Sequence, residues 1–222
     1  MREHKAIQAI AALVTAGAVA SMIIIGHGGF GASLNPALPR AAGAALARQA
    51  LSCLKPGGQI MVITRDTDAF QNPASDFLLA GFERELRQAH AGINTLQRLQ
   101  TDPLRLVEVP SGDFQNWIHH AAAGDVIVSF MGPPLLTPEQ RRQLGEIQPA
   151  VMAFCPGNWP ERVDLRPLFA AGLLRAAVVA RPNPTRAASN SGQFDQNFTV
   201  VTQANVDDFM AAAEKTPGSQ SP

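Results

Sequence analysis

Six polar side chains that follow apolar runs of the chain could together bind a small molecule. They are Arg65, Asp66, Asp68, Asn72, Asn158 and Trp159. In open parallel α/β sheets, ligands bind beyond the carboxyl ends of the strands, and both runs, 59–64 and 150–155, have the length of a strand. We therefore expect a pocket there, with Trp159 stacking on the ligand and Arg65 or Asp66 forming hydrogen bonds to it. The alternative is that these residues are ordinary polar caps of loops.

Residues that could carry catalysis do not form a recognisable set. The chain contains no G-x-S-x-G motif that would place a serine nucleophile. His119 and His120 are adjacent, so on a helix they point about 100° apart and do not converge on a metal as residues four apart do. We therefore predict a non-enzyme without cofactor or metal. An enzyme that uses the strand-end acids Asp66 and Asp68 is the alternative.

The two cysteines, Cys53 and Cys155, lie far apart in the sequence. Neither has a second Cys or His at the spacing of zinc ligands. The favoured interpretation is two small buried side chains, and a disulfide in an oxidising compartment is the alternative.

The N-terminal segment is apolar enough to cross a membrane. Residues 6–25 carry no charge, and about 20 helical residues span the hydrocarbon core of a bilayer. Arg2 and Lys5 precede the segment, which predicts that Met1 stays in the cytoplasm while the rest is exported. We expect a retained anchor in a bacterial inner membrane with the domain in the periplasm. Cleavage before Ser21, which would release the domain into the periplasm, is the alternative.

A second interpretation of the same region is a dinucleotide-binding turn. Residues 26–31 (GHGGFG) follow an apolar run and match G-x-G-x-x-G. The fingerprint also needs an acidic residue about 20 positions later to bind the ribose, and no Asp or Glu occurs between Glu3 and Asp66. A flexible stretch beside the membrane explains these glycines better.

The composition favours one well-packed domain and excludes a nucleic-acid platform. Of the 222 residues, 46% are hydrophobic and 16% charged, and the net charge is zero. A sizeable core can be buried with this composition. Proteins that bind nucleic acid through phosphate contacts carry a basic excess, which is absent here.

Strand-length apolar runs alternate with helical patterns from residue 38 onward. After an Ala-rich helix over 38–54, we expect strands at 59–64, 104–109, 126–130, 150–155, 176–180 and 198–202. The helices between them are expected to begin at caps formed by Asn72, Asp113, Thr137, Asp164 and Asn205. Repeated β-α units of this kind predict an α/β fold with a doubly wound, mostly parallel, flavodoxin-like sheet.

Several of these segments resemble the type I periplasmic sugar-binding proteins and the related ligand domains of repressors. The resemblance is carried by residues 60–64 (IMVIT), Asn72-Pro73, residues 81–83 (GFE) and residues 124–128 (GDVIV), and it extends over about 59–181. It implies the fold of one lobe of such a protein and a small polar ligand such as a sugar. Two departures stand out: Ala74-Ser75 replace the aromatic pair that contacts the sugar in the family, and the chain has residues for one lobe only.

These observations lead to one interpretation of the whole chain. We expect an anchor at residues 1–27, a juxtamembrane segment with an Ala-rich helix at 28–58, the α/β domain at 59–213 and a tail at 214–222. The expected function is a membrane-anchored accessory or scaffold subunit that binds a protein partner or a second copy of itself. A half-receptor for a small polar molecule is the second hypothesis.

Overall fold

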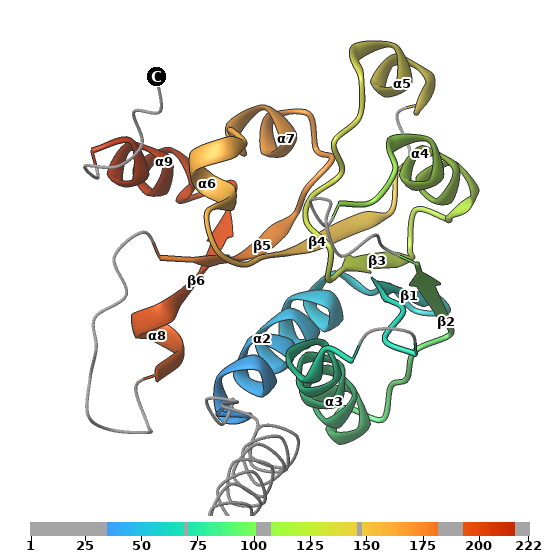
Figure 1. Cartoon of the computed structure of the whole chain (residues 1–222). Coiled ribbons are helices and arrows are strands. Elements are labelled where there is room, and N and C mark those ends of the chain that lie inside the picture. The colour runs from blue at the N-terminus through green and yellow to red at the C-terminus, as the bar shows by residue number, and fades with distance from the viewer. Residues whose placement is uncertain (1–34, 69–70, 101–107, 146–147, 182–192, 216–222) are drawn as a thin grey trace, which may run out of the picture. The chain divides into compact units, whose positions relative to one another are not determined.

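A computed structural model describes residues 35–68, 71–100, 108–145, 148–181 and 193–215 of the chain. The chain divides into two compact units at Asn35, and the fold described below belongs to the unit Pro36–Pro222 (Figure 1). Its strands are β1 (Ile60–Arg65), β2 (Thr95–Leu99), β3 (Val126–Ser129), β4 (Ala150–Cys155), β5 (Ala176–Ala180) and β6 (Phe198–Thr202). Its helices are α2 (Ala37–Cys53), α3 (Pro73–Gln88), α4 (Ser111–His120), α5 (Pro138–Gln143), α6 (Trp159–Arg162), α7 (Arg166–Ala170), α8 (Gln193–Asn197) and α9 (Val206–Glu214).

The six strands form one sheet in the order β2-β1-β3-β4-β5-β6. The first five strands are parallel, and β6 pairs antiparallel to β5, with Ala180 opposite Phe198. Parallel strands need crossover connections, and helices supply most of them here. The mostly parallel α/β sheet expected from the sequence is confirmed.

Side chains alternate along each strand and build a core on each face of the sheet. Val62, Val128 and Met152 point into the α2-side core, which they share with residues of α2 and α3 such as Leu46 and Phe82. The opposite face carries the α4-side core, to which α4, α6, α7 and α9 contribute; its members include Ile63, Ile127, Phe114, Leu168 and Met210. Figure 1 shows the two groups of helices on either side of the sheet. The sheet is therefore doubly wound.

The second strand is not where the sequence pattern places it. It lies at Thr95–Leu99; residues 104–107 of the predicted strand lie outside the described residues, and Glu108 and Val109 belong to no strand. The strand β2 is at the edge of the sheet, and its side chains are only partly buried. Its sequence (TLQRL) consequently lacks the continuous apolar run that marks the central strands.

Helix starts follow the predicted caps in part. Thr137 forms the predicted capping box with Gln140, and the Asn72 side chain caps α3.

The other three predicted caps differ in detail. Asp113 lies in the first turn of α4, which begins two residues earlier after Pro110. The Asp164 carboxylate accepts the Arg166 N–H ahead of α7. Asn205 precedes α9 as predicted, but its side-chain oxygen accepts the Thr202 N–H and makes no cap hydrogen bond. All five predicted positions thus lie within two residues of the first residue of a helix, and only some of them make the predicted hydrogen bond.

The predicted anchor at residues 1–27, the cleavage site and the glycine motif at 26–31 all lie outside the described residues. Among the helices that are described, none is long and apolar enough to cross a bilayer.

The two cysteines are free thiols on opposite faces of the sheet. Cys53 packs against the α2-side core, whereas Cys155 is fully buried in the α4-side core. Burial raises the pKa of the Cys155 thiol, because a thiolate is poorly solvated in an apolar surrounding. Cys155 is therefore a small core side chain with little nucleophilic character.

Candidate functional site

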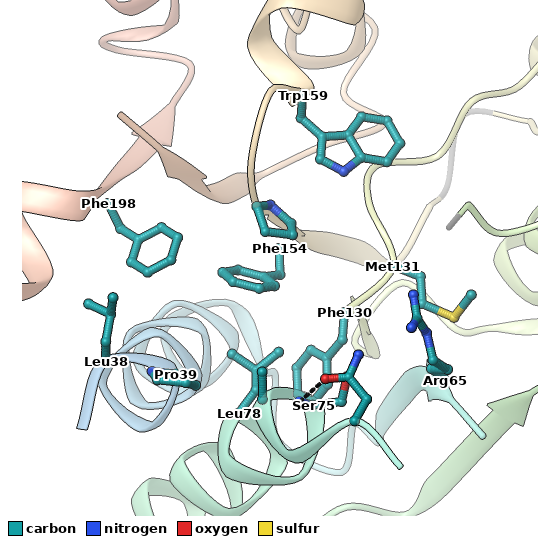
Figure 2. A pocket seen from close by; sticks show the side chains of 13 residues that line it. Leu38, Pro39, Arg65, Ser75, Leu78, Phe130, Met131, Phe154, Trp159 and Phe198 are labelled. Carbon is teal, nitrogen blue, oxygen red and sulfur yellow. Dashed lines mark hydrogen bonds between the residues drawn. The ribbon is translucent and has the colours of Figure 1, made fainter. Parts of the chain in front are cut away.

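A pocket of about 320 Å³ lies at the carboxyl edge of the parallel strands. Its lining comes from the ends of β1 and β4, the turn after β3, the first residues of α2, α3 and β6, and α6. The lining residues are Leu38, Pro39, Arg65, Asn72, Ala74, Ser75, Leu78, Phe130, Met131, Phe154, Pro156, Trp159 and Phe198 (Figure 2). Ligands of open α/β sheets bind at this edge, and mostly apolar pockets with a few convergent polar groups are typical binding sites.

The turn after β3 and the helix α6 position the aromatic wall of the pocket. The Ser129 hydroxyl accepts the Met131 N–H at 3.2 Å, and the Phe130 N–H donates to the Ile63 carbonyl at 2.8 Å. Gly132 follows with a φ of +98°, and its α-carbon lies against the indole ring of Trp159. Trp159 is only 7% exposed, and its ring is flanked by the Arg162 guanidinium, 5.6 Å from the ring centroid.

The start of α3 forms another wall. Asn72 caps the helix: its side-chain oxygen accepts the Ser75 N–H at 3.4 Å, and Pro73 occupies the first turn. This cap brings Ala74 and Ser75 to the pocket surface. The N-terminal end of a helix carries a partial positive charge, so this wall favours electron-rich ligand atoms.

Three of the six predicted site residues line the pocket. Arg65, Asn72 and Trp159 come together there, although they are separated by as many as 94 positions, from 65 to 159. Asp66, Asp68 and Asn158 do not line it. The Asp66 carboxylate accepts the Asp68 N–H at 3.0 Å, and the side chains of Asp68 and Asn158 are exposed.

The histidine pair predicted not to bind metal is exposed at the end of α4. The two rings lie 5.7 Å apart at a steep angle, and Nδ1 of His120 is 2.7 Å from the Asn116 carbonyl oxygen. Across the described part of the chain, no three Cys, His, Asp or Glu side chains gather where they could hold a metal ion.

Comparisons with known proteins identify the fold. No model of a known protein family matches the chain, and a search of curated proteins finds no match. Among solved structures, the substrate-binding protein of a sugar ABC transport system from Bordetella parapertussis superposes with a TM-score of 0.51 at 15% identity, covering 83% of this chain and 62% of that one. AraP, an arabinose-binding protein from Geobacillus stearothermophilus, gives 0.47 at 16% identity, with 77% and 63% covered. A solute-binding protein from Agrobacterium vitis bound to α-D-tagatopyranose gives 0.48 at 17% identity, with 79% and 59% covered.

These likenesses concern the fold. The chain spans about three fifths of the length of these solved proteins. Its α/β domain has the fold of a single lobe of a type I periplasmic binding protein, as the sequence resemblance predicted. The solved protein from Bordetella parapertussis is named as a substrate-binding protein.

Proposed function

We propose that this protein is a small-molecule binding module that acts without catalysis. One observation carries the proposal: the carboxyl edge of the sheet holds a pocket in which Arg65, Asn72 and Trp159 meet apolar side chains. The fold supports it, because the solved proteins with a similar lobe are named as solute-binding or sugar-binding proteins. Asp66 and Asp68 lie outside the pocket lining, which argues against an enzyme that uses them.

Filling the pocket tests this function. In the variant Ala74→Leu a larger side chain occupies the lining of the pocket, and Leu is, like Ala, a good helix former. We expect wild-type full-length protein in mild detergent to be stabilised by at least one member of a panel of D-arabinose, L-leucine, phenylacetate and inorganic phosphate. Thermal unfolding gives the shift, and calorimetric titration gives the Kd. Ala74→Leu should raise that Kd at least tenfold.

The matched control is Ala80→Leu, because Ala80 is an exposed position of the same helix. It should bind as wild type does. If no probe stabilises the wild type, or if Ala74→Leu and Ala80→Leu bind equally well, the pocket is not a binding site.

A second function follows from the apolar N-terminal segment. We propose that residues 6–25 anchor the domain at the periplasmic face of an inner membrane, where it serves as an accessory subunit of a larger complex. In this proposal, a protein partner or a second copy of the chain covers the open side of the pocket. The segment's lack of charge and the preceding Arg2 and Lys5 support it.

Extraction from native membranes tests the accessory role. The full chain should remain in the membrane fraction after washing with carbonate and should co-purify in mild detergent with a stoichiometric partner or as a dimer. Recovery in the soluble fraction would contradict anchoring. Recovery from membranes as a lone monomer would contradict the role of a subunit.

A further inference from the structure

Three donor groups of the pocket have no acceptor within the described part of the chain. Among the described residues, the Arg65 guanidinium and the indole N–H of Trp159 make no hydrogen bond, and Arg65 forms no ion pair. The Asn72 side-chain oxygen is occupied by the Ser75 N–H, which leaves its NH₂ group as a donor. Arg65 and Asn72 are half-buried, and none of the three groups has a donor that is sealed from water without a partner. A bound molecule with acceptor atoms can therefore take the place of that water.

The indole N–H of Trp159 is one of these three donor groups, and its position relative to the pocket can be followed in Figure 2. The residue is 7% exposed, and Figure 2 shows the indole nitrogen on the edge of the ring that faces the pocket. This nitrogen is not sealed from water, and because Trp159 lines the pocket it can donate to a molecule bound there.

Acidic side chains are absent from the lining. None of the described residues that line the pocket is Asp or Glu, so the one formal charge among them is the positive charge of Arg65. The nearest acids along the chain have other hydrogen bonds: the Asp66 carboxylate accepts the Asp68 N–H, and the Asp76 carboxylate accepts the Thr67 hydroxyl at 3.3 Å. A ligand rich in hydroxyl donors would find few acceptors in this pocket, whereas an anion would find a cation and further donors.

Apart from Ser75, the remainder of the lining is apolar or aromatic. Phe130, Phe154, Phe198, Leu38 and Met131 cover most of it, and Figure 2 shows Phe198 and Arg65 on opposite sides of the pocket. A bare inorganic anion would leave that apolar wall in contact with water. The volume of about 320 Å³ is at the small end for ligand pockets, which suits a molecule built on one ring or a short branched chain.

We propose that the ligand of this pocket is a small organic acid with an apolar or aromatic body, and that Arg65 binds its carboxylate. This inference rests on the proposed binding function and names its ligand class. The planar guanidinium can bind both oxygens of a carboxylate, and the Trp159 N–H supplies a further donor. The ring or branched chain of the ligand then packs against the phenylalanine side chains at the far side.

A pair of probes that differ only in charge tests the inference. Phenylacetate and phenylacetamide have nearly the same shape, but only the first is an anion. Calorimetric titration of the full chain should give a Kd for phenylacetate at least tenfold below that for phenylacetamide. Arg65→Gln should raise the Kd for phenylacetate at least tenfold and leave that for phenylacetamide within twofold. Trp159→Phe keeps an aromatic ring without the donor and should weaken phenylacetate binding severalfold.

The matched control is Arg175→Gln, because Arg175 is an exposed arginine before β5, at the opposite edge of the sheet. It should bind both probes as wild type does, which separates a local contact from a change in net charge. Equal affinity for the acid and the amide, or binding of D-arabinose or inorganic phosphate but not phenylacetate, overturns this inference and leaves the binding function standing. Binding of none of these probes contradicts both.

Discussion

Replacing Gly43 with alanine should destabilise the domain by about 2 kcal/mol, because this glycine lies where two helices touch through their backbones. A β-carbon at Gly43 would lie 2.0 Å from the Leu78 carbonyl oxygen and 2.8 Å from the Phe82 nitrogen. Both are backbone atoms of α3, so no side-chain rotation can relieve the clash. The helices must move apart, and the α2-side core loses contacts when they do.

Replacing a glycine with alanine at an open helical position should instead stabilise the domain. Gly112 is in the first turn of α4, and a β-carbon there would meet nothing within 4 Å. Gly112→Ala should stabilise the domain by roughly 0.5 kcal/mol, because alanine has less freedom to lose on folding than glycine. Denaturant unfolding of both variants measures the two changes. Equal effects at Gly43 and Gly112 would mean that the helices α2 and α3 are not packed this closely.

Gly81 tests whether the close contact between α2 and α3 causes this loss of stability. Its β-carbon would lie 2.2 Å from the Arg40 carbonyl oxygen, so each helix contributes one glycine to the contact. Once the helices have separated to admit one methyl group, admitting a second methyl group requires less additional movement of the helices. The double variant Gly43→Ala with Gly81→Ala should therefore be destabilised by less than the sum of the single changes.

The pocket depends on this helix contact. The first residues of α2 supply Leu38 and Pro39 to its lining, and the first turn of α3 supplies Asn72 and Ala74. Moving the two helices apart therefore also displaces two walls of the pocket. A residue remote from any ligand can change binding through the position of the elements that it joins.

The sequence predicts those residues of the site that follow directly after parallel strands or mark the start of a helix. Arg65 ends β1 and Trp159 begins α6 shortly after β4, so an apolar run followed by polar residues was enough to place them at the carboxyl edge. Asn72 was found through the Asn-Pro signal of a helix start. Such signals are local in the chain, and the parallel arrangement of the strands brings them to one edge.

The lining residues that the sequence did not predict reach the pocket through the arrangement of strands and helices in space, which no local pattern of residues indicates. Phe198 is the first residue of β6, and it reaches the pocket only because β6 runs antiparallel and pairs it with Ala180 at the end of β5. Leu38 and Pro39 precede every strand of the described sheet, so strand-end reasoning could not select them. Asp66 was expected at the site, but its N–H donates to the Leu99 carbonyl, at the side of β2, and its side chain does not line the pocket.

Replacing Gly132 with alanine should weaken ligand binding more than it weakens the fold. Gly132 has a φ of +98°, which strains any other residue, and its β-carbon would lie 2.4 Å from the Trp159 ring. The ring is packed on its other sides, with the α4-side core among its neighbours, and the pocket is the adjacent open space. The new methyl group should therefore push the indole toward the pocket and reduce the room for a ligand. We expect a loss of about 2 kcal/mol in stability and at least a tenfold rise in the Kd of whichever probe binds.

The variant Gly172→Ala separates the strain of the backbone from the displacement of the ring. Gly172 also has a positive φ, +68°, but a β-carbon there would meet nothing within 4 Å. It should lose about 1 kcal/mol of stability and keep the wild-type Kd, because only the backbone is strained. The chain has two tryptophans, so fluorescence measured with Trp117→Phe in every protein reports on Trp159 alone. Its emission should shift in Gly132→Ala and stay unchanged in Gly172→Ala; an unchanged spectrum and Kd in Gly132→Ala would show that the indole does not form this wall of the pocket.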